Sequence, residues 1–317
     1  MKIMEKRIRC PQEDSRRVGH NMNSFLAENE SMEAIPKKQS YFVIIMQRVF
    51  KNPVATTGLI VFVIMVLLAV LAPLIAPYDY VEMNPLNRFS SPSWKHLCGT
   101  DDFGRDIFSR LLYGARYSLS LGIAAQILQL TLGVFLGCIA GYYGGRTEQI
   151  IMRACDIMQA IPNLLLAIII STALGIGFIN TVIALGVGHV ASSCRLIRAQ
   201  FLPLRELEYV EAERSINCSA SRLIFRHLLP NAVSPLIVQT TMGIGGAITS
   251  AAALSFLGLG VQPPTPEWGA MLTAATPYIR YYPYMIYFPG ICIAIVVMAL
   301  NLFGDGLRDA LDPKLKQ

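Results

Sequence analysis

The sequence predicts an all-α polytopic membrane protein with six transmembrane helices. Hydrophobic residues make up 53% of its 317 residues and charged residues only 15%, and the mean hydropathy is +0.46. This composition is typical of multi-span membrane proteins and excludes an ordinary soluble domain. Long uncharged segments alternate with polar ones, and the net charge of +6 fits basic cytoplasmic loops and gives no sign of nucleic-acid binding.

The first 40 residues are polar and mixed in charge, without the apolar core of a cleavable signal peptide. We expect residues 1–40 to be a flexible cytoplasmic extension. Residues 41–55 begin with an amphipathic stretch, which we expect to lie along the membrane interface. An early start of the first span explains this stretch equally well. Lysines and arginines before the first apolar run place this end in the cytoplasm.

Residues 56–116 are expected to form the first transmembrane helix and an extracytoplasmic segment. The helix is predicted from Thr56 to Ala76, an uncharged run of about the 20 residues needed to cross a bilayer. Near the end of the segment, Asp106 and Arg110 are spaced to pair at i, i+4 at the start of an amphipathic helix. A metal or phosphate site among its Asp, Gly and His residues is the weaker interpretation.

The second span is predicted from Tyr117 to Ala140, where Gly133 and Gly137 form a small-x-x-x-small pair that allows close helix packing. The glycine cluster that follows is not a phosphate loop, because the chain contains no G-x-x-x-x-G-K-[ST] sequence. The chain is therefore not expected to be an enzyme that hydrolyses ATP by itself.

No charged residue occurs from Pro162 to Cys194. A helix of that length would extend about 50 Å, too long for one crossing of a core about 30 Å thick. We therefore predict two spans that turn near 174–177, the third starting near Asp156 and the fourth ending near Ser193. His189, near the end of the fourth, is expected to be a packed, hydrogen-bonded residue rather than a proton carrier.

The fifth span is predicted from Ser234 to Leu254 and is rich in small residues, which suit a tightly packed helix that lines a pore. The last span is predicted from Tyr284 to Phe303, and residues 305–317 as a cytoplasmic tail. Prolines prevent a helix at 263–266. Five aromatic residues are expected at the membrane surface: Trp268, Tyr278, Tyr281, Tyr282 and Tyr284.

The loop of about residues 195–231, between the fourth and fifth spans, is too charged to lie in hydrocarbon. It is long enough to fold, although an ordinary solvated loop is an open alternative. We predict one short helix over 209–216, with a left-handed residue at Asn217 as its stop. Ser219 or Ser221 is expected to cap a second helix, and Pro230 to mark the next break.

This loop resembles the EAA loop of ABC importer permeases. Glu211-Ala212-Glu213, then Asn217, then His227-Leu228-Leu229-Pro230 have the spacing of that motif. Glu213 stands where the family has alanine, and Asn217 where it has glycine. The segments 96–119, 256–269 and 304–313 also resemble C-type permease subunits of dipeptide, oligopeptide and nickel importers. The resemblance covers the chain from about Thr56 onward.

The resemblance implies a type I ABC importer permease fold, with the five remaining helices in a core permease domain over residues 117–304. It implies a homologous B-type permease, two ABC ATPase subunits, an extracytoplasmic solute-binding protein and membrane lipid as partners, and no nucleic acid, cofactor or metal. The coupling helix would dock on an ATPase. The implied ATPase-coupling residues are Glu208, Tyr209, Glu211, Ala212, Glu213, Arg214, Asn217, Arg222, His227 and Pro230.

Two alternatives stay open at this stage. Di- or oligopeptides are the first choice of cargo, and nickel or a metal chelate is the second. A secondary, ion-driven transporter is the alternative of a different class, but it needs ionisable residues within its spans, and only His189 qualifies.

The seven cysteines form no C-x-x-C pair and are expected to be small buried hydrophobes. Six spans would place both termini in the cytoplasm of a prokaryotic cell.

Overall fold

The computed structural model describes residues 41–311, and the extension predicted over residues 1–40 lies outside them. The described part is all-helical, apart from one isolated bridge between Thr100 and Asp106. α2 (Tyr41–Lys51) covers the first amphipathic stretch. Its placement along a membrane stays a prediction. Among the described residues, 41–47 and 48–311 belong to two separate units.

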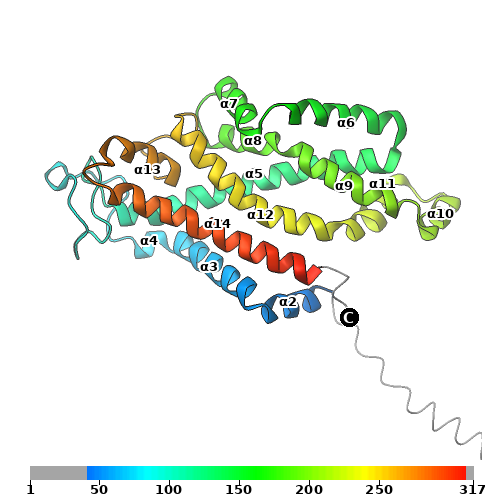
Figure 1. The fold of residues 1–317 in the computed structure, drawn as a ribbon, viewed down its shortest axis with the longest axis horizontal. Coiled ribbons are helices and arrows are strands. Elements are labelled where there is room, and N and C mark those ends of the chain that lie inside the picture. The colour runs from blue at the N-terminus through cyan, green and yellow to red at the C-terminus, as the bar shows by residue number, and fades with distance from the viewer. Residues whose placement is uncertain (1–40, 312–317) are drawn as a thin grey trace, which may run out of the picture. The chain divides into compact units, whose positions relative to one another are not determined.

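The unit from Arg48 onward is a bundle of long helices (Figure 1). Four helices are long and apolar enough to cross a membrane, and counting each of two bent pairs as one span gives six. The number of crossings itself stays a prediction. The elements are α3 (Pro53–Val70), α4 (Ala72–Ile75), η1 (Pro85–Asn87), α5 (Ile107–Tyr143), α6 (Gly145–Ala160), α7 (Asn163–Leu174), α8 (Phe178–Gly188), α9 (Val190–Leu204), α10 (Glu208–Ser215), α11 (Ala220–Arg222), η2 (Leu223–Leu228), α12 (Leu229–Phe256), α13 (Trp268–Ala275), η3 (Thr276–Tyr278) and α14 (Tyr284–Leu311).

The third predicted span is not one straight helix. α6 and α7 meet at an angle of 91°. Ile161 and Pro162 separate them and have extended backbone. Proline has no N–H to donate and disfavours helical geometry in the residue before it, so the helix stops there. The fourth span also bends, by 40° between α8 and α9 at His189.

α5 is the central helix of the unit and contacts α3, α8, α9 and α12. The glycine pair predicted to allow close packing lies against α9. A Cβ built on Gly133 would lie 2.5 Å from the Ser193 Cβ, and one on Gly137 would lie 2.6 Å from the Cys194 carbonyl oxygen. Both distances are below van der Waals contact, so the approach of α5 to α9 depends on the missing side chains.

Substituting Gly137→Val is expected to lower the free energy of unfolding by about 1–3 kcal/mol or more, because the valine has no space between α5 and α9. Denaturation of the purified protein in detergent measures this change. Gly290→Val in α14 is the matched control, since a Cβ there meets nothing within 4 Å. Equal stability of the two variants would contradict the packing argument.

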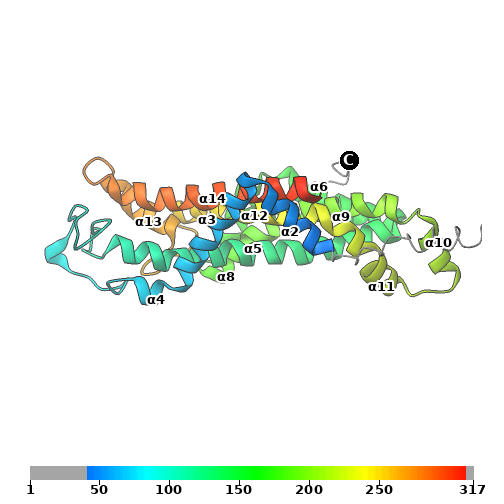
Figure 2. The same ribbon diagram turned by 90° about the horizontal axis from the view of Figure 1, so that it is seen from below.

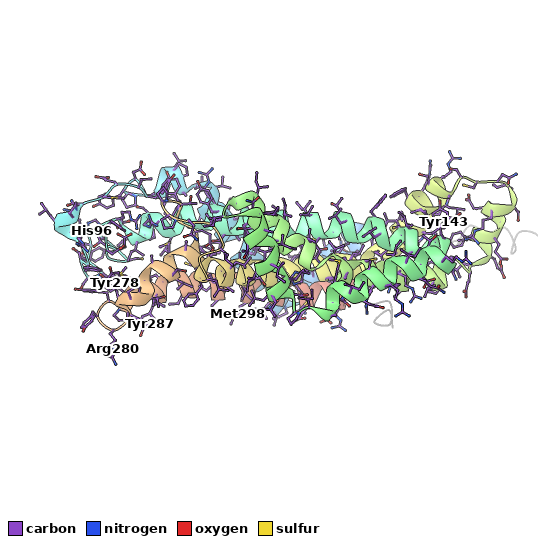
Figure 3. All side chains as sticks on the ribbon, turned by 90° about the horizontal axis from the view of Figure 1, so that it is seen from above. His96, Tyr143, Tyr278, Arg280, Tyr287 and Met298 are labelled. Carbon is purple, nitrogen blue, oxygen red and sulfur yellow. The ribbon has the colours of Figure 1, made fainter. Side chains whose placement is uncertain are left out.

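The two ends of the bundle carry different structures. α10 lies at one end, and the segment 76–106 and α13 lie at the other, in both views (Figures 1 and 2). Figure 3 places Tyr143, at the end of α5, near the α10 end, and His96, Tyr278 and Arg280 at the opposite end. The polar loop and the segment before α5 therefore lie at opposite ends of the long helices.

A buried network of charged side chains organises the segment before α5. Asp101 accepts hydrogen bonds from the backbone N–H groups of Phe103 and Arg105, both at 2.9 Å, and from the Arg105 Nε at 2.6 Å. The Nε of Arg110 lies 3.6 Å from the same carboxylate. Burial, and secondly the charge of Asp101, raise the pKa of Asp102.

The predicted pair between Asp106 and Arg110 is wrong. Asp106 is the N-cap of α5, where its Oδ2 accepts from the N–H and Oγ of Ser109, both at 2.8 Å. Its Oδ1 lies 2.9 Å from the Nδ1 of His96. The orphan N–H groups of the helix N-terminus compete successfully for the carboxylate. Arg110 turns instead toward Asp101 and the Tyr80 carbonyl oxygen.

The sequence predicts Trp268 at the membrane surface, but the residue is buried inside the bundle. Its side chain is 0% exposed, and its indole N–H donates to the Leu111 carbonyl oxygen at 3.1 Å. Gly114 on α5 leaves room for the ring. Two of the tyrosines instead hold the segment before α5: Tyr282 stacks on Phe89, and the Tyr284 hydroxyl donates to the Thr100 carbonyl oxygen.

Candidate functional site

The candidate site is the loop between α9 and α12, which folds around the short helix α10. The prediction of one short helix is confirmed, with its start moved by one residue to Glu208 and its end at Ser215. Glu208 and Glu211 lie in its first turn and Arg214 in its last. These charges complement the partial positive charge at the start of a helix and the negative charge at its end.

Asn217 ends α10 in the conformation predicted for it. Its φ is 57°, in the left-handed region. The N–H of Cys218 donates to the Glu213 carbonyl oxygen and the N–H of Asn217 to that of Arg214, both at 3.0 Å. These two bonds form the Schellman motif, which usually has glycine at this position. The side chain of Asn217 is therefore compatible with the backbone turn.

Val210 anchors α10 to the bundle. It is the one buried residue of this helix, with 0% exposure. It packs in a hydrophobic cluster with residues from α5, α9, η2 and α12, namely Cys138, Ile197, Phe201, Leu223, Ile224, Leu228, Ala232 and Leu236. Burial of one valine is worth about 1.5–3 kcal/mol. Val210 is thus the apolar contact that fixes this helix on the bundle.

Glu213 has a partner inside the loop. Its Oε1 lies 3.5 Å from the Nε2 of His227, which belongs to η2. The pair links α10 to the start of the next long helix and accounts for the acidic side chain at this position. Desolvation, and then the Glu213 carboxylate, raise the pKa of the Cys218 thiol.

The break predicted at Pro230 is absent. From Ala220 to Phe256 the chain forms one continuous helix, 37 residues long. It contains the π-helical turn η2, after which the N–H of Leu229 donates to the Ile224 carbonyl oxygen. The wider π turn accommodates the proline ring and its missing N–H, so the helix continues. Ser219 is the N-cap residue of α11, but its side chain makes no capping hydrogen bond.

Most of the predicted coupling residues are exposed, and two exposed apolar residues accompany them. Tyr209, Glu211, Ala212, Arg214, Asn217 and Arg222 face solvent. Ile216 is 77% exposed and Phe225 is 54% exposed. Neither Ile216 nor Phe225 was predicted as a coupling residue, although Ile216 directly precedes the predicted stop of the helix. Arg214 also lies over the Tyr142 ring at the end of α5, 5.3 Å from its centroid.

Ion pairs stiffen the structure behind α10. The Nε of Arg198 on α9 donates to Glu148 on α6 at 2.8 Å. Arg195 on α9 likewise pairs with Asp156 on α6. The Nη1 of Arg205 donates to the Gly141 carbonyl oxygen at 3.3 Å. These three arginines thus connect α9 to α6 and α5.

Substituting Asn217→Gly is expected to leave the protein unchanged, whereas Asn217→Val is expected to destabilise α10. A β-branched residue with φ near 57° is strained, at a cost of about 1–2 kcal/mol. Proteolysis of the loop in detergent measures this fraying. Ser221→Val, at an exposed helical position of the same loop, serves as the control. Equal cleavage of the two valine variants would contradict the role of the left-handed turn.

Residues 41–311 contain histidine, cysteine and acidic side chains, which are common metal ligands. No group of three or more His, Cys, Asp or Glu residues there is arranged to hold a metal ion. His189 is hydrogen-bonded, as expected: its Nδ1 lies 3.1 Å from the Leu185 carbonyl oxygen. The carbonyl only accepts, so Nδ1 carries the proton.

Comparison with known proteins covers nearly the entire described chain. Residues 133–317 match the family described as binding-protein-dependent transport system inner membrane component. Residues 40–92 match the N-terminal TM domain of oligopeptide transport permease C. Over 266 residues the chain is 48% identical to the dipeptide transport system permease protein DppC of Alkalihalophilus pseudofirmus, covering 84% of this chain and 88% of that protein.

Other relatives are similar at the same level. The oligopeptide transport system permease protein OppC of Bacillus subtilis is 43% identical, over 90% of this chain and 94% of its own length. The glutathione transport system permease protein GsiD of Pectobacterium atrosepticum is 43% identical, over 85% of this chain and 90% of its own length. The fold is also that of the MetNI methionine ABC transporter in an inward-facing conformation, with a TM-score of 0.53 at 18% identity, covering 65% of this chain and 98% of that chain.

Proposed function

The chain belongs to the family of binding-protein-dependent transport system inner membrane components, the permease subunits of ABC importers, and on that premise we propose that it imports di- or oligopeptides and couples to a separate ATPase through α10. Permeases of this family are transport subunits rather than enzymes. In this proposal the chain forms one half of the translocation pore, and a homologous permease forms the other half.

The observation that carries the coupling proposal is the construction of α10. It is a short helix at one end of the bundle, largely exposed and held by the buried Val210 and by the Glu213–His227 contact. The bonded network of α5, α6 and α9 lies behind it, and the continuous helix from Ala220 to Phe256 leads from it into the bundle. A force applied to such an element moves a long helix as a unit.

Co-purification tests the assembly. The tagged protein is purified from its native membrane in mild detergent, and the proteins that come with it are identified by mass spectrometry. We expect a second permease and two ATPase subunits, with an extracytoplasmic binding protein that names the cargo. Recovery of the chain alone, or only with itself, would contradict the proposal.

Reversing one charge on α10 tests the docking surface. Glu211 is exposed on this helix and is a candidate to pair with an arginine of the ATPase. Glu211→Lys is expected to lose ATPase association and uptake, because a like charge then faces the partner. Glu206→Lys, an equal reversal at an exposed position before α10, is the control. Retained association of the first variant would place the docking surface elsewhere.

The energy source distinguishes this function from a secondary transporter. Uptake by whole cells is expected to stop when ATP is depleted and to continue in the presence of an uncoupler. Peptide cargo is preferred over nickel because the named relatives carry dipeptides, oligopeptides or glutathione. The family fits a multi-pass protein of the cell membrane, and we place both termini in the cytoplasm.

A further inference from the structure

A cavity of about 210 Å³ lies in the middle of the bundle, between α5, α8, α9 and α12. It is smaller than the roughly 300–1,000 Å³ of a pocket that encloses a drug-sized ligand, so it has room for part of such a molecule. Its lining includes Gln129, His189, Ser192, Gln239, Gly243 and Gly246. The lining contains polar groups but no Asp, Glu, Lys or Arg.

Polar side chains in the middle of a membrane bundle are either links between helices or part of a pathway. Some of the groups here are links. The Gln239 Nε2 donates to the Ser192 Oγ at 2.8 Å, and the Gln129 Nε2 donates to the Ser193 Oγ at 2.9 Å. Both bonds connect α9 to a neighbouring helix.

The remaining groups of the cavity are not explained by these links. The Gln239 Oε1 is buried from solvent and has no hydrogen-bond partner among the described residues. Leaving a buried acceptor unpaired is unfavourable, and a bound donor would satisfy it. The Nδ1–H of His189 donates to the Leu185 carbonyl oxygen, so Nε2 of the neutral tautomer is a further acceptor. Because Ser192 accepts from Gln239, its hydroxyl is free to donate.

The cavity is also open on one side. Ser192 and Gly246 are exposed at its rim, and a Cβ built on Gly246 would meet nothing within 4 Å. On the other side, Gly243 lets the Gln126 side chain lie against α12, where a Cβ would be 2.8 Å from its Cδ. The space at Gly243 is thus taken by Gln126, whereas Gly246 leaves its side of the cavity free for an entering molecule.

From this lining we propose that the cavity binds the main-chain amide of a peptide as it crosses the membrane. A peptide group presents one N–H donor and one carbonyl acceptor, which complement the Gln239 Oε1 and the free hydroxyl of Ser192. The absence of charge from the lining leaves the termini and charged side chains of the peptide without partners here. Such a site reads the backbone and tolerates many sequences. This inference rests on the proposed import of peptides.

The test uses the complete importer in proteoliposomes, with saturating binding protein so that its affinity does not limit the rate. The maximal uptake of dialanine is compared with that of its analogue methylated at the peptide nitrogen, which cannot donate. Gln239→Leu is expected to lower dialanine uptake about three- to tenfold and to reduce the ratio between the two peptides. Gln239→Asn, which keeps the amide, is expected to fall between this variant and the native protein.

Thr249→Val, on an exposed position of α12 outside the lining, is the matched control and should change neither uptake nor ratio. Because the binding protein is the same in every sample, a change in the ratio reports on the permease. Equal ratios in Gln239→Leu and the native protein would overturn the proposal, whether or not uptake falls, since a purely structural role lowers both peptides alike. Failure of the native importer to transport either peptide would instead refute the proposed function itself.

Discussion

Replacing Val210 by aspartate is expected to abolish ATP-driven uptake while the long helices stay folded. The carboxylate would enter the cluster of Phe201, Leu223 and Leu228 that holds α10. Moving a charge into such surroundings costs several kcal/mol, which exceeds the roughly 1.5–3 kcal/mol that the valine contributes by burial. α10 would therefore leave its seat and no longer present a fixed surface to an ATPase.

Uptake, ATPase co-purification and thermal denaturation of the purified complex together measure this effect. Ser219→Asp adds the same charge to the same loop at the N-cap of α11, where aspartate is a favoured residue. We expect this variant to transport normally. Normal uptake by Val210→Asp would show that coupling does not depend on the position of α10.

The sequence predicted the parts of this fold that follow from local chemistry. Long uncharged runs located the helices, and the preference of asparagine for left-handed backbone located the end of α10. The bend after α6 was missed because hydropathy records only that residues are apolar, while the single proline at 162 decides the direction of the chain. The continuation through Pro230 was missed because a π turn depends on the packing of Leu223 and Leu228.

The candidate site divides in the same way. The exposed charges of α10 were evident from the sequence, since no partner could be found for them in hydrocarbon. Val210 and the Glu213–His227 contact were not, because both depend on how α10 folds back on η2. The cavity beside Gln239 brings together residues of four helices far apart in the sequence. Distances of that kind are set by tertiary packing, which periodicity does not encode.

The second large effect is expected from Asp101→Asn, in the segment before α5. Arg105 and Arg110 are each only 4% exposed and both face this carboxylate. Removing one partner of a buried ionic network leaves uncompensated charge and typically costs about 3–5 kcal/mol. We expect the folded protein to lose stability by this amount, measured by denaturation in detergent, since Asp102 lies 3.8 Å from Arg105 and replaces only part of the attraction.

The dependence on pH gives this prediction a second readout. Because the pKa of Asp102 is raised in the folded protein, its carboxyl group binds a proton more tightly there than in the unfolded chain. Its contribution to stability is therefore complete below its ordinary pKa and is lost as the pH rises through the raised value. Asp101→Asn removes the charge that is the second cause of the raised Asp102 pKa. The loss of stability with rising pH should therefore occur at a lower pH in this variant, while burial still keeps the Asp102 pKa above its ordinary value. Asp79 is an exposed aspartate of the same segment, and its carboxylate accepts from the Val81 N–H at 2.9 Å. Asp79→Asn should change neither property; a matching response of the two variants would show that the network does not hold this end of the bundle.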